Sequence, residues 1–166
     1  MIRCEEKILD RGPLAARLAD LRKAGKKIVF TNGCFDLVHT GHLRYLEAAR
    51  RLGGALVVAV NGDASLHKLK GEGRPVLPAG QRKRVLAGFE CVDFVTEFDE
   101  DTPHNLLKLL QPEILAKGAN YPVEGVVGRE IVWEYGGEVR TVELTGGKST
   151  TDIIQRILAS TGEKKN

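Results

Sequence analysis

Cysteine is scarce in this sequence of 166 residues. Cys4, Cys34 and Cys91 are odd in number and widely spaced, and no two of them form a C-x-x-C pair. A disulfide framework needs paired cysteines and a structural zinc site needs clustered ligands, so the pattern indicates neither. It fits the reducing environment of the cytoplasm, where we expect the protein to be located.

Long apolar runs and blocks of like charge are also missing. No stretch approaches the ~20 apolar residues of a membrane-spanning helix, and the opening MIRCEEKILD lacks the apolar core of a signal peptide. The formal net charge is only +3, and the lysines and arginines form no long block. We therefore expect the protein to bind neither membranes nor nucleic acid.

The composition is that of one folded domain. Hydrophobic residues make up 42% and charged residues 28% of the chain, a balance typical of soluble globular proteins. A chain of this length buries one sizeable core. We expect a helical lead-in over residues 1–26 that packs on the domain, the domain itself over residues 27–160, and a flexible tail over residues 161–166.

Short apolar runs alternate with helical patterns along the chain. Several runs are apolar on both faces, as strands buried inside a parallel sheet must be. The alternation predicts an α/β domain with five strands in a mostly parallel sheet. The expected strands are residues 27–32, 55–61, 92–98, 113–118 and 138–144, and the expected helices are residues 13–24, 43–52, 82–89, 106–110, 127–135 and 151–158.

Polar or glycine-containing segments follow several of these strands. They are Thr31-Asn32-Gly33, Asn61-Gly62-Asp63, Lys117-Gly118 and, after the last strand, GGKSTTD. In folds of this class, ligands bind outside the carboxyl ends of the parallel strands. We therefore expect the segments to meet along one edge of the sheet and to form the binding site there.

Two histidines, His39 and His42, stand where the first strand gives way to a helix. A helix amino terminus binds anions, phosphate above all, and both imidazoles can reach one bound anion. Gly41 between them lets a phosphate chain or a flat ring approach the backbone. The alternative is that the histidines are surface or capping residues. No third ligand stands at metal spacing, although Asp36 is a possible contributor, so we predict no metal site built from protein ligands alone.

The run NGCFDLVHTGHLRYLEAARRLG resembles the signature of the nucleotidyltransferase superfamily with the His-x-Gly-His motif. Ser149-Thr150-Thr151 is similar to a second element of that superfamily, before its last helix. The resemblance implies a Rossmann-like three-layer sandwich of the nucleotidyltransferase type. It also implies an in-line attack of a phosphate oxygen on a nucleoside triphosphate, for which the protein supplies alignment and charge stabilisation but no nucleophile.

Three further segments narrow the resemblance. VNGDASLHKLKGEGRPVLPAGQR, VDFVTEFDEDTPHNLLKLLQPEILAKGANY and VVGREIVWEYGGEV resemble the adenylyltransferases of D-glycero-β-D-manno-heptose 1-phosphate. This implies the conversion of ATP and heptose 1-phosphate into ADP-heptose and pyrophosphate, with Mg²⁺, for lipopolysaccharide precursor synthesis. Members of the family are commonly dimers. In many bacteria the domain is fused behind a heptose-phosphate kinase, and we expect the stand-alone form here.

Two alternatives remain open. Related glycerol-phosphate cytidylyltransferases carry Arg-Thr-Glu-Gly before the Ser-Thr-Thr run, where this chain has Thr145-Gly146-Gly147-Lys148, which disfavours that activity. A non-catalytic nucleotide-binding module is the third possibility. The heptose enzymes usually show Gly-Gly-Asp-Tyr after the fourth strand, and this chain has Asn120 where they have the acid.

The residues and the resemblance together predict three groups of site residues. Lys70 and Arg82 enter because they match positions that the family uses for phosphate contact. The predicted catalytic residues are His39, His42 and Lys70. The predicted nucleotide-binding residues are Thr31, Asn32, Gly33, Phe35, His39, Gly41, His42, Arg82, Lys117, Gly118, Ser149, Thr150 and Thr151, and the predicted substrate-binding residues are Asp36, Asn61, Asp63, Lys70, Arg74 and Asn120.

Several of these residues have an equally simple structural interpretation. One residue of Ser149-Thr150-Thr151 can be the amino-terminal cap of a helix. Asp36, Asn61 and Asp63 can bind substrate or hold the turns in which they lie. We expect Cys34 to pack in the interior and not to act as a nucleophile.

Overall fold

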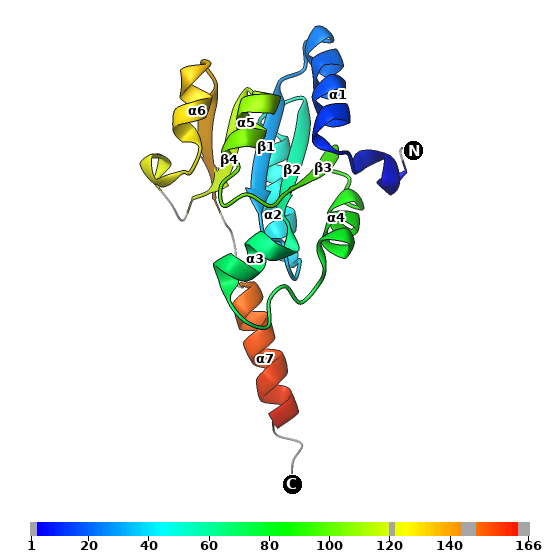
Figure 1. The fold of residues 1–166 in the computed structure, drawn as a ribbon, viewed down its shortest axis with the longest axis vertical. Helices are drawn as coiled ribbons and strands as arrows, with labels where there is room; N and C mark the ends of the chain where they lie inside the picture. Colours follow the sequence, from blue (N-terminus) through cyan, green and yellow to red (C-terminus); the bar gives the residue numbers. More distant parts are fainter. Residues whose placement is uncertain (1–2, 120–121, 144–148, 163–166) are drawn as a thin grey trace.

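The computed structural model describes residues 3–119, 122–143 and 149–162 and shows a single five-stranded sheet (Figure 1). The strand order is β3-β2-β1-β4-β5, and every neighbouring pair is parallel. The predicted α/β fold with five strands is confirmed, and the sheet is parallel throughout. The strands are β1 Ile28–Gly33, β2 Ala55–Asn61, β3 Phe94–Phe98, β4 Ile114–Gly118 and β5 Glu138–Val142.

The described helices follow the predicted pattern with one addition. No helix was predicted between the second expected strand and residue 82, but α3 forms there. This helix lies between Gly62 and Gly71 and buries only Ser65 and Leu66, so its apolar periodicity is too weak to recognise in the sequence. The helices are α1 Arg11–Lys23, α2 Thr40–Arg50, α3 Asp63–Lys70, α4 Ala79–Ala87, α5 His104–Leu110, α6 Arg129–Glu134 and α7 Thr150–Gly162, with short 3₁₀ turns η1 Cys4–Lys7 and η2 Val123–Gly125.

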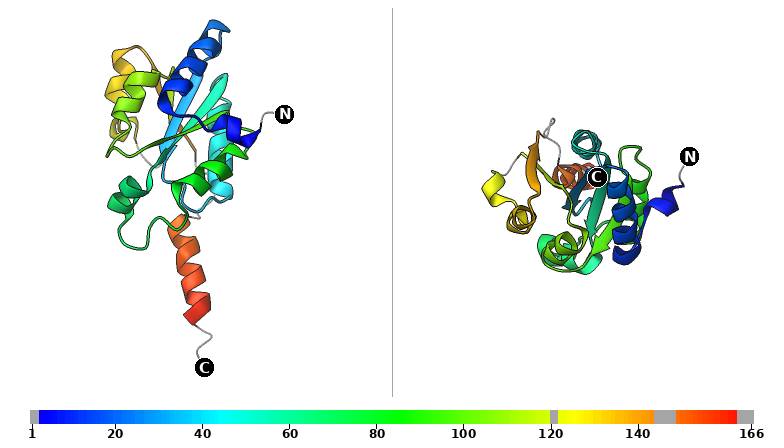
Figure 2. Two further views of the ribbon diagram at one scale, coloured as in Figure 1. Left: turned by 45° about the vertical axis from the view of Figure 1, so that its right-hand side comes forward. Right: turned by 90° about the horizontal axis from the view of Figure 1, so that it is seen from above.

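Helices cover both faces of the sheet and make the three layers of the predicted sandwich (Figure 2). On one face, α1, α5 and α6 pack on alternate strand residues such as Phe30 and Val57. On the other, α2 and α4 pack on the intervening residues such as Val29 and Val58. Every residue of β2 is buried, as expected for an inner parallel strand.

The amino-terminal segment contributes to this core. Leu14 and Leu18 on α1 are both 0% exposed and belong to the same apolar cluster as Phe30. Before α1, Leu9 donates its backbone N–H to the carbonyl of Val95 at 3.0 Å, which adds a short parallel bridge at the outer edge of β3. The described part of this segment, residues 3–26, therefore contributes to the core on one face of the sheet.

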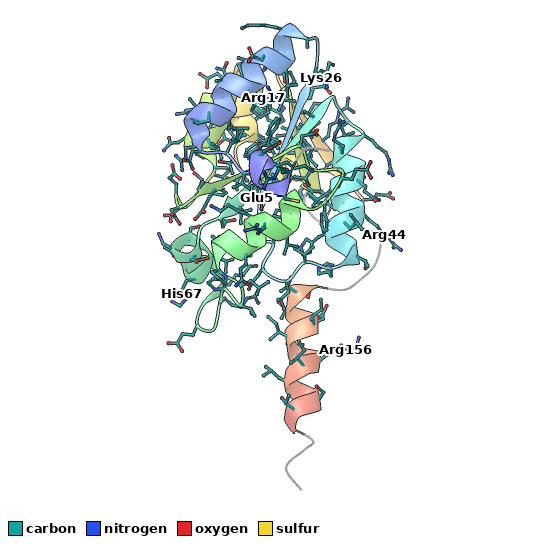
Figure 3. All side chains as sticks on the ribbon, turned by 90° about the vertical axis from the view of Figure 1, so that its right-hand side faces the viewer. Glu5, Arg17, Lys26, Arg44, His67 and Arg156 are labelled. Carbon is teal, nitrogen blue, oxygen red and sulfur yellow. The ribbon has the colours of Figure 1, made fainter. Side chains whose placement is uncertain are left out.

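The last helix, α7, points away from the sheet (Figure 1). Figure 3 shows it with Arg156, at the opposite end of the molecule from Arg17 on α1. Its first turn is held to the body by the Thr150 hydroxyl, which donates to the carbonyl of Leu37 at 3.1 Å. Among the described helices, none combines the length and apolar character needed to cross a lipid bilayer.

The strand order places a reversal between β1 and β4, because the chain runs from β1 outward to β3 and then returns to β4. In doubly wound sheets the ligand crevice lies at the carboxyl ends of the strands at this reversal. The end of β1 leads into the loop that carries His39, and the end of β4 carries Lys117.

Candidate active site

His39 and His42 form the start of α2, and each ring is oriented by a backbone amide. His39 is the amino-terminal cap, and its Nδ1 accepts a hydrogen bond from the Gly41 N–H at 3.1 Å. The Nδ1 of His42 accepts from the His39 N–H at 3.3 Å. The two ring centroids are 4.0 Å apart. A neutral imidazole that accepts at Nδ1 carries its proton on Nε2, so each ring retains an Nε2–H donor.

The surroundings of the two rings keep both imidazoles neutral. Burial lowers the pKa of His39 below its ordinary value. Burial and the proximity of His39 together lower the pKa of His42 to about 4. No described residue accepts a hydrogen bond from either Nε2. The pair is therefore a set of two uncharged donors available to an anion.

The glycine at the end of β1 makes room for an aromatic ring. A Cβ on Gly33 would lie 3.1 Å from Cε2 of Phe35. Phe35 has a φ of 45°, is 5% exposed, and its ring centroid lies 5.3 Å from that of His42. Gly33 thus allows Phe35 to pack beneath the histidine turn.

Lys117 connects the ends of β4 and β1 at the sheet reversal. Its Nζ donates to the backbone carbonyl of Asn32 at 3.0 Å and to the Asn32 side-chain oxygen at 2.5 Å. Burial lowers the pKa of Lys117 to about 8. The half-buried Gly118 follows it at the end of the strand. This places a partly buried ammonium group at the expected ligand crevice.

Cys34 and Asn61 lie between the ends of β1 and β2. Cys34 Sγ is 4.0 Å from Asn61 Oδ1, and the Asn61 amide donates to Ser65 Oγ at 3.3 Å. Burial raises the pKa of the Cys34 thiol, and the positive charges of Lys70 and Arg82, which lower it, do not cancel that effect. The thiol stays protonated near neutral pH, which agrees with the packing role expected of it. Lys70 is the exposed last residue of α3, the helix that follows β2.

Asp36 holds the loop between α3 and α4 and has almost no exposed surface. Its side chain accepts from Arg74 Nε at 2.5 Å and from the backbone N–H groups of Val76 and Leu77 at 2.9 and 3.0 Å. Burial raises the pKa of the carboxyl group, but these hydrogen bonds and the Arg74 charge outweigh it, so the pKa lies below its ordinary value. Asp36 is 1% exposed, so the structure shows it as a loop anchor; its direct contact with substrate stays a prediction.

Arg82 is also enclosed by protein groups. It is 0% exposed and donates to the carbonyls of Leu77 and Cys34 at 2.9 and 2.7 Å and to Asp63 Oδ1 at 2.7 Å. Asp63 Oδ1 accepts in addition from the Ala79 N–H at 2.8 Å. Arg82 therefore joins three segments around the crevice, and its predicted contact with the nucleotide stays untested.

Sequence reasoning missed one residue near the site. Tyr45 hydroxyl lies 2.7 Å from Thr31 Oγ1 and donates to the carbonyl of Ala116 at 3.0 Å, so it links β1, α2 and β4. Burial raises the pKa of Tyr45 to about 12. Thr31 itself is 0% exposed. The sequence feature that could have identified Tyr45 is a hydroxyl-bearing side chain on the buried face of α2, one turn after His42.

The Ser-Thr-Thr run includes a helix cap. Ser149 donates its N–H to Asp152 Oδ2 at 2.8 Å, and the Asp152 N–H donates to Ser149 Oγ at 3.1 Å, which is a reciprocal capping box for α7. Thr150 is held to Leu37, whereas Thr151 is exposed. Asn120 and residues 145–148 lie outside the described residues.

A family model described as cytidylyltransferase-like matches residues 30–156, which include both histidines and the beginning of α7. The chain belongs to the cytidylyltransferase-like family. The nucleotidyltransferase resemblance drawn from the His-x-Gly-His turn is thereby confirmed.

Relatives of this cytidylyltransferase-like chain include proteins named bifunctional protein HldE. The chain is 48% identical to that of Geobacter sulfurreducens over 96% of its own length and 33% of the relative. It is 52% identical to that of Pelobacter propionicus over 93% and 32% of the two lengths. It therefore spans about one third of the curated relatives it matches.

A solved structure shares the fold. The lipopolysaccharide core biosynthesis protein from Thermoplasma volcanium superposes with a TM-score of 0.60 at 24% sequence identity, covering 75% of this chain and all of that one. The likeness supports the Rossmann-like arrangement of the cytidylyltransferase-like domain at the level of the fold.

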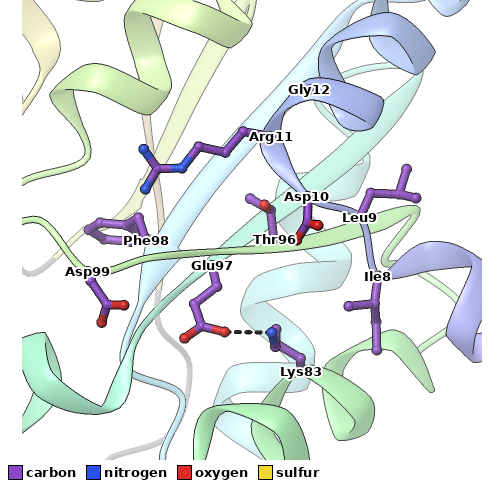
Figure 4. Close-up of a pocket in the computed structure, with 10 residues that line it drawn as sticks. All are labelled: Ile8, Leu9, Asp10, Arg11, Gly12, Lys83, Thr96, Glu97, Phe98 and Asp99. Carbon is purple, nitrogen blue, oxygen red and sulfur yellow. Dashed lines mark ion pairs between the residues drawn. The ribbon is translucent and has the colours of Figure 1, made fainter.

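The cytidylyltransferase-like domain also has a pocket outside the histidine site. A cavity of about 480 Å³ lies at the outer edge of β3. Arg11, Lys83 and Glu97 are among its lining residues (Figure 4). It contains neither histidine, so it is separate from the site at the β1–β4 reversal. Among the described residues, no three His, Cys, Asp or Glu side chains gather closely enough to hold a metal ion.

Proposed function

We propose that the chain is an adenylyltransferase that transfers AMP from ATP to D-glycero-β-D-manno-heptose 1-phosphate. The products are ADP-heptose, a precursor for the lipopolysaccharide core, and pyrophosphate. Support comes from family membership, from relatives about 50% identical that are named HldE, and from the segments that resemble heptose 1-phosphate adenylyltransferases. The observation that carries the catalytic part is the pair of neutral histidines whose Nε2–H groups have no acceptor among the described residues.

In the proposed reaction, a phosphate oxygen of the sugar attacks the α-phosphorus of ATP and displaces pyrophosphate. Negative charge grows on the equatorial and leaving oxygens, and preorganised donors stabilise it. His39 and His42 donate from Nε2 without changing protonation state, because both are already neutral with the proton on that nitrogen. Lys70 and Lys117 supply positive charge to the phosphates, and the amino terminus of α2 adds its dipole.

We propose Mg²⁺ as the cofactor, bound together with ATP. Magnesium is usually held by substrate phosphates, water and one or two carboxylates. In such an arrangement the triphosphate itself would supply most of the ligands. When bound, the ion would offset negative charge on the triphosphate, and the histidines would act on the oxygens that remain accessible.

The rival function is a cytidylyltransferase acting on glycerol 3-phosphate or a related phosphorylated alcohol, and the description of the matching family is compatible with CTP as the nucleotide. A panel of ATP and CTP against heptose 1-phosphate and glycerol 3-phosphate, read as pyrophosphate release, separates the two. Turnover with ATP and heptose 1-phosphate is expected. Turnover with CTP alone would assign the rival function, and nucleotide binding without turnover would indicate a non-catalytic module.

We also infer that the protein acts as a homodimer. Ile157 and Leu158 on α7 are 52% and 64% exposed, and Trp133 on α6 is 49% exposed. Ile157 and Leu158 are adjacent on a helix that points away from the body (Figure 1), where a second copy would cover them. Sedimentation equilibrium at micromolar concentration is expected to give twice the chain mass, and a monomer at every concentration would refute the inference.

A further inference from the structure

Two buried groups of opposite charge connect the loop before α2 with the loop between α3 and α4. The first loop is residues 34–39 and the second is residues 71–78. Asp36, in the first loop, is 1% exposed, and Arg82, on α4 directly after the second loop, is 0% exposed. Neither side chain has surface available for a ligand of any size.

Each of the two charged side chains links the first loop to the second. Asp36 accepts from Arg74, Val76 and Leu77 of the second loop. Arg82 donates to the carbonyl of Cys34 in the first loop and to that of Leu77 in the second. The backbone of the second loop is therefore held by Asp36 of the first loop, and the backbone of the first loop is held by Arg82 of α4.

The loop between α3 and α4 depends on these anchors for its course. No residue from 71 to 78 is in a helix or strand. Gly71 and Gly73 have φ values of +84° and +75°, a region that side chains rarely adopt. Side chains from outside the loop thus replace the regular hydrogen bonding that a helix or strand would provide.

The two loops flank the groups proposed to meet phosphate. His39 stands three residues after Asp36, and Lys70 stands four residues before Arg74 at the end of α3. Burying ions has a large desolvation cost, and apolar replacements are often as stable. Each of the two ion pairs at this place, Asp36 with Arg74 and Arg82 with Asp63, has one enclosed member, and both pairs are therefore better explained by the geometry they impose than by the stability they add.

We propose that Asp36 and Arg82 are positioning residues that set the histidine turn relative to Lys70, and that neither contacts substrate. The inference rests on the proposed function and revises two expectations within it, since Asp36 was predicted to bind substrate and the family resemblance implied that Arg82 contacts phosphate. A misplacement of reacting groups by about 1 Å can lower the rate of a positioned reaction by about a hundredfold.

The test compares Arg82→Lys with Arg82→Gln and includes Asp36→Asn. Lysine keeps the charge of Arg82 but not its three divergent hydrogen bonds. If Arg82 positions the loops, Arg82→Lys and Arg82→Gln both lose kcat, by about ten- to a hundredfold, with KM for ATP changing little. If Arg82 contacts phosphate, Arg82→Lys retains most of the activity and Arg82→Gln raises KM, which would overturn the proposal.

Glu100→Gln and Arg11→Lys are the matched controls. Arg11 donates to both Glu100 oxygens at 2.6 Å, in an ion pair away from the histidine turn. These variants weaken a bidentate ion pair that is about one third exposed and lies outside the two loops, so kcat is expected to remain at the wild-type value. A kcat loss in the controls equal to that in Asp36→Asn would show a general effect of weakened folding and overturn the assignment.

A double-mutant cycle and a spectroscopic readout complete the design. Asp36→Asn combined with Lys70→Met is expected to cost less in kcat/KM than the product of the single losses, because Asp36 acts through the placement of Lys70. Independent, multiplicative losses would contradict that link.

The imidazole NMR signals of His39 and His42 should shift in Asp36→Asn and not in Glu100→Gln, whatever the substrate. Absent wild-type turnover refutes the proposed function, whereas unchanged imidazole signals refute the positioning role.

Discussion

Replacing His42 by asparagine or by glutamine separates the two nitrogens of its ring. The Nδ1 of His42 accepts from the His39 N–H at 3.3 Å and completes the capping of α2, whereas Nε2–H is the proposed donor to phosphate. The amide oxygen of asparagine can replace Nδ1, and the amide nitrogen of glutamine can replace Nε2. Both variants remove the ring that lies against Phe35, so the difference between them reports the separate roles of the two nitrogens.

The expected effects have different sizes. Loss of a helix cap costs about 1 kcal/mol, which in a chain of this length lowers Tm by roughly 2–4 °C. Loss of one preorganised donor costs about 100- to 1,000-fold in kcat, or about 3–4 kcal/mol. His42→Asn is therefore expected to keep its Tm and to lose kcat, and His42→Gln to lower Tm and retain the larger share of kcat.

Pyrophosphate release measures kcat, and circular dichroism against temperature measures Tm. His104→Asn, on α5, serves as a control that should leave kcat unchanged. If His42→Asn kept wild-type kcat with ATP and the preferred sugar phosphate, Nε2 would not be a transition-state donor, and the proposed use of the histidine pair would be wrong.

Three further measurements test other parts of the structure. The pKa of His42 is lowered from 6.5 to about 4, so between these pH values the unfolded chain binds more protons than the folded one. The free energy of unfolding should therefore fall as pH drops from 6.5 towards 4. Thermal unfolding between pH 4.5 and 7.5 should show a smaller decline in His42→Asn than in the wild type, and equal declines would contradict the assignment. Lys117 has a pKa of about 8, so ATP affinity by calorimetry should weaken as pH rises through 8, and a Lys117→Met variant with the same pH dependence would exclude this lysine as its source. A Cβ on Gly53 would lie 2.7 Å from Val29 Cγ2 and 2.9 Å from the Lys27 carbonyl, so Gly53→Ala should lower the free energy of unfolding in urea by about 1–3 kcal/mol. Gly80 on α4 has open space around a new Cβ, so Gly80→Ala should raise it by about 0.5–1 kcal/mol. The opposite order would refute the packing argument.

The histidine turn shows how far sequence reasoning reached. The sequence predicted that His39 and His42 begin a helix after a buried strand, and the structure has β1 end at Gly33 and α2 begin at Thr40. These features are local, since strand and helix periods and the spacing at a helix start are set by neighbouring residues. The capping interpretation and the anion-binding interpretation turned out to be compatible, because Nδ1 serves the first and leaves Nε2 for the second.

Asp36 and Arg82 show where sequence reasoning stopped. Asp36 was given two interpretations, binding substrate or holding its turn, and Arg82 was predicted to contact the nucleotide because it matches a position that the family uses for phosphate contact. The structure places them at 1% and 0% exposure, with partners in the loop between α3 and α4. Tyr45 was missed because its partners Thr31 and Ala116 belong to two different strands, whose pairing the sequence does not show.

The sequence by itself determined the alternation of strands and helices, the parallel α/β fold, and the turn that presents two imidazoles. Only the tertiary structure decided which charged groups are enclosed, which ring nitrogens are engaged, and which lysine lies at the sheet reversal. The physical reason is range: helix and strand patterns repeat over a few residues, whereas Asp36 and Arg74 are 38 positions apart and Asn32 and Lys117 are 85 apart. Partners at such separations meet only because the strand order brings the loops that carry them to one edge of the sheet.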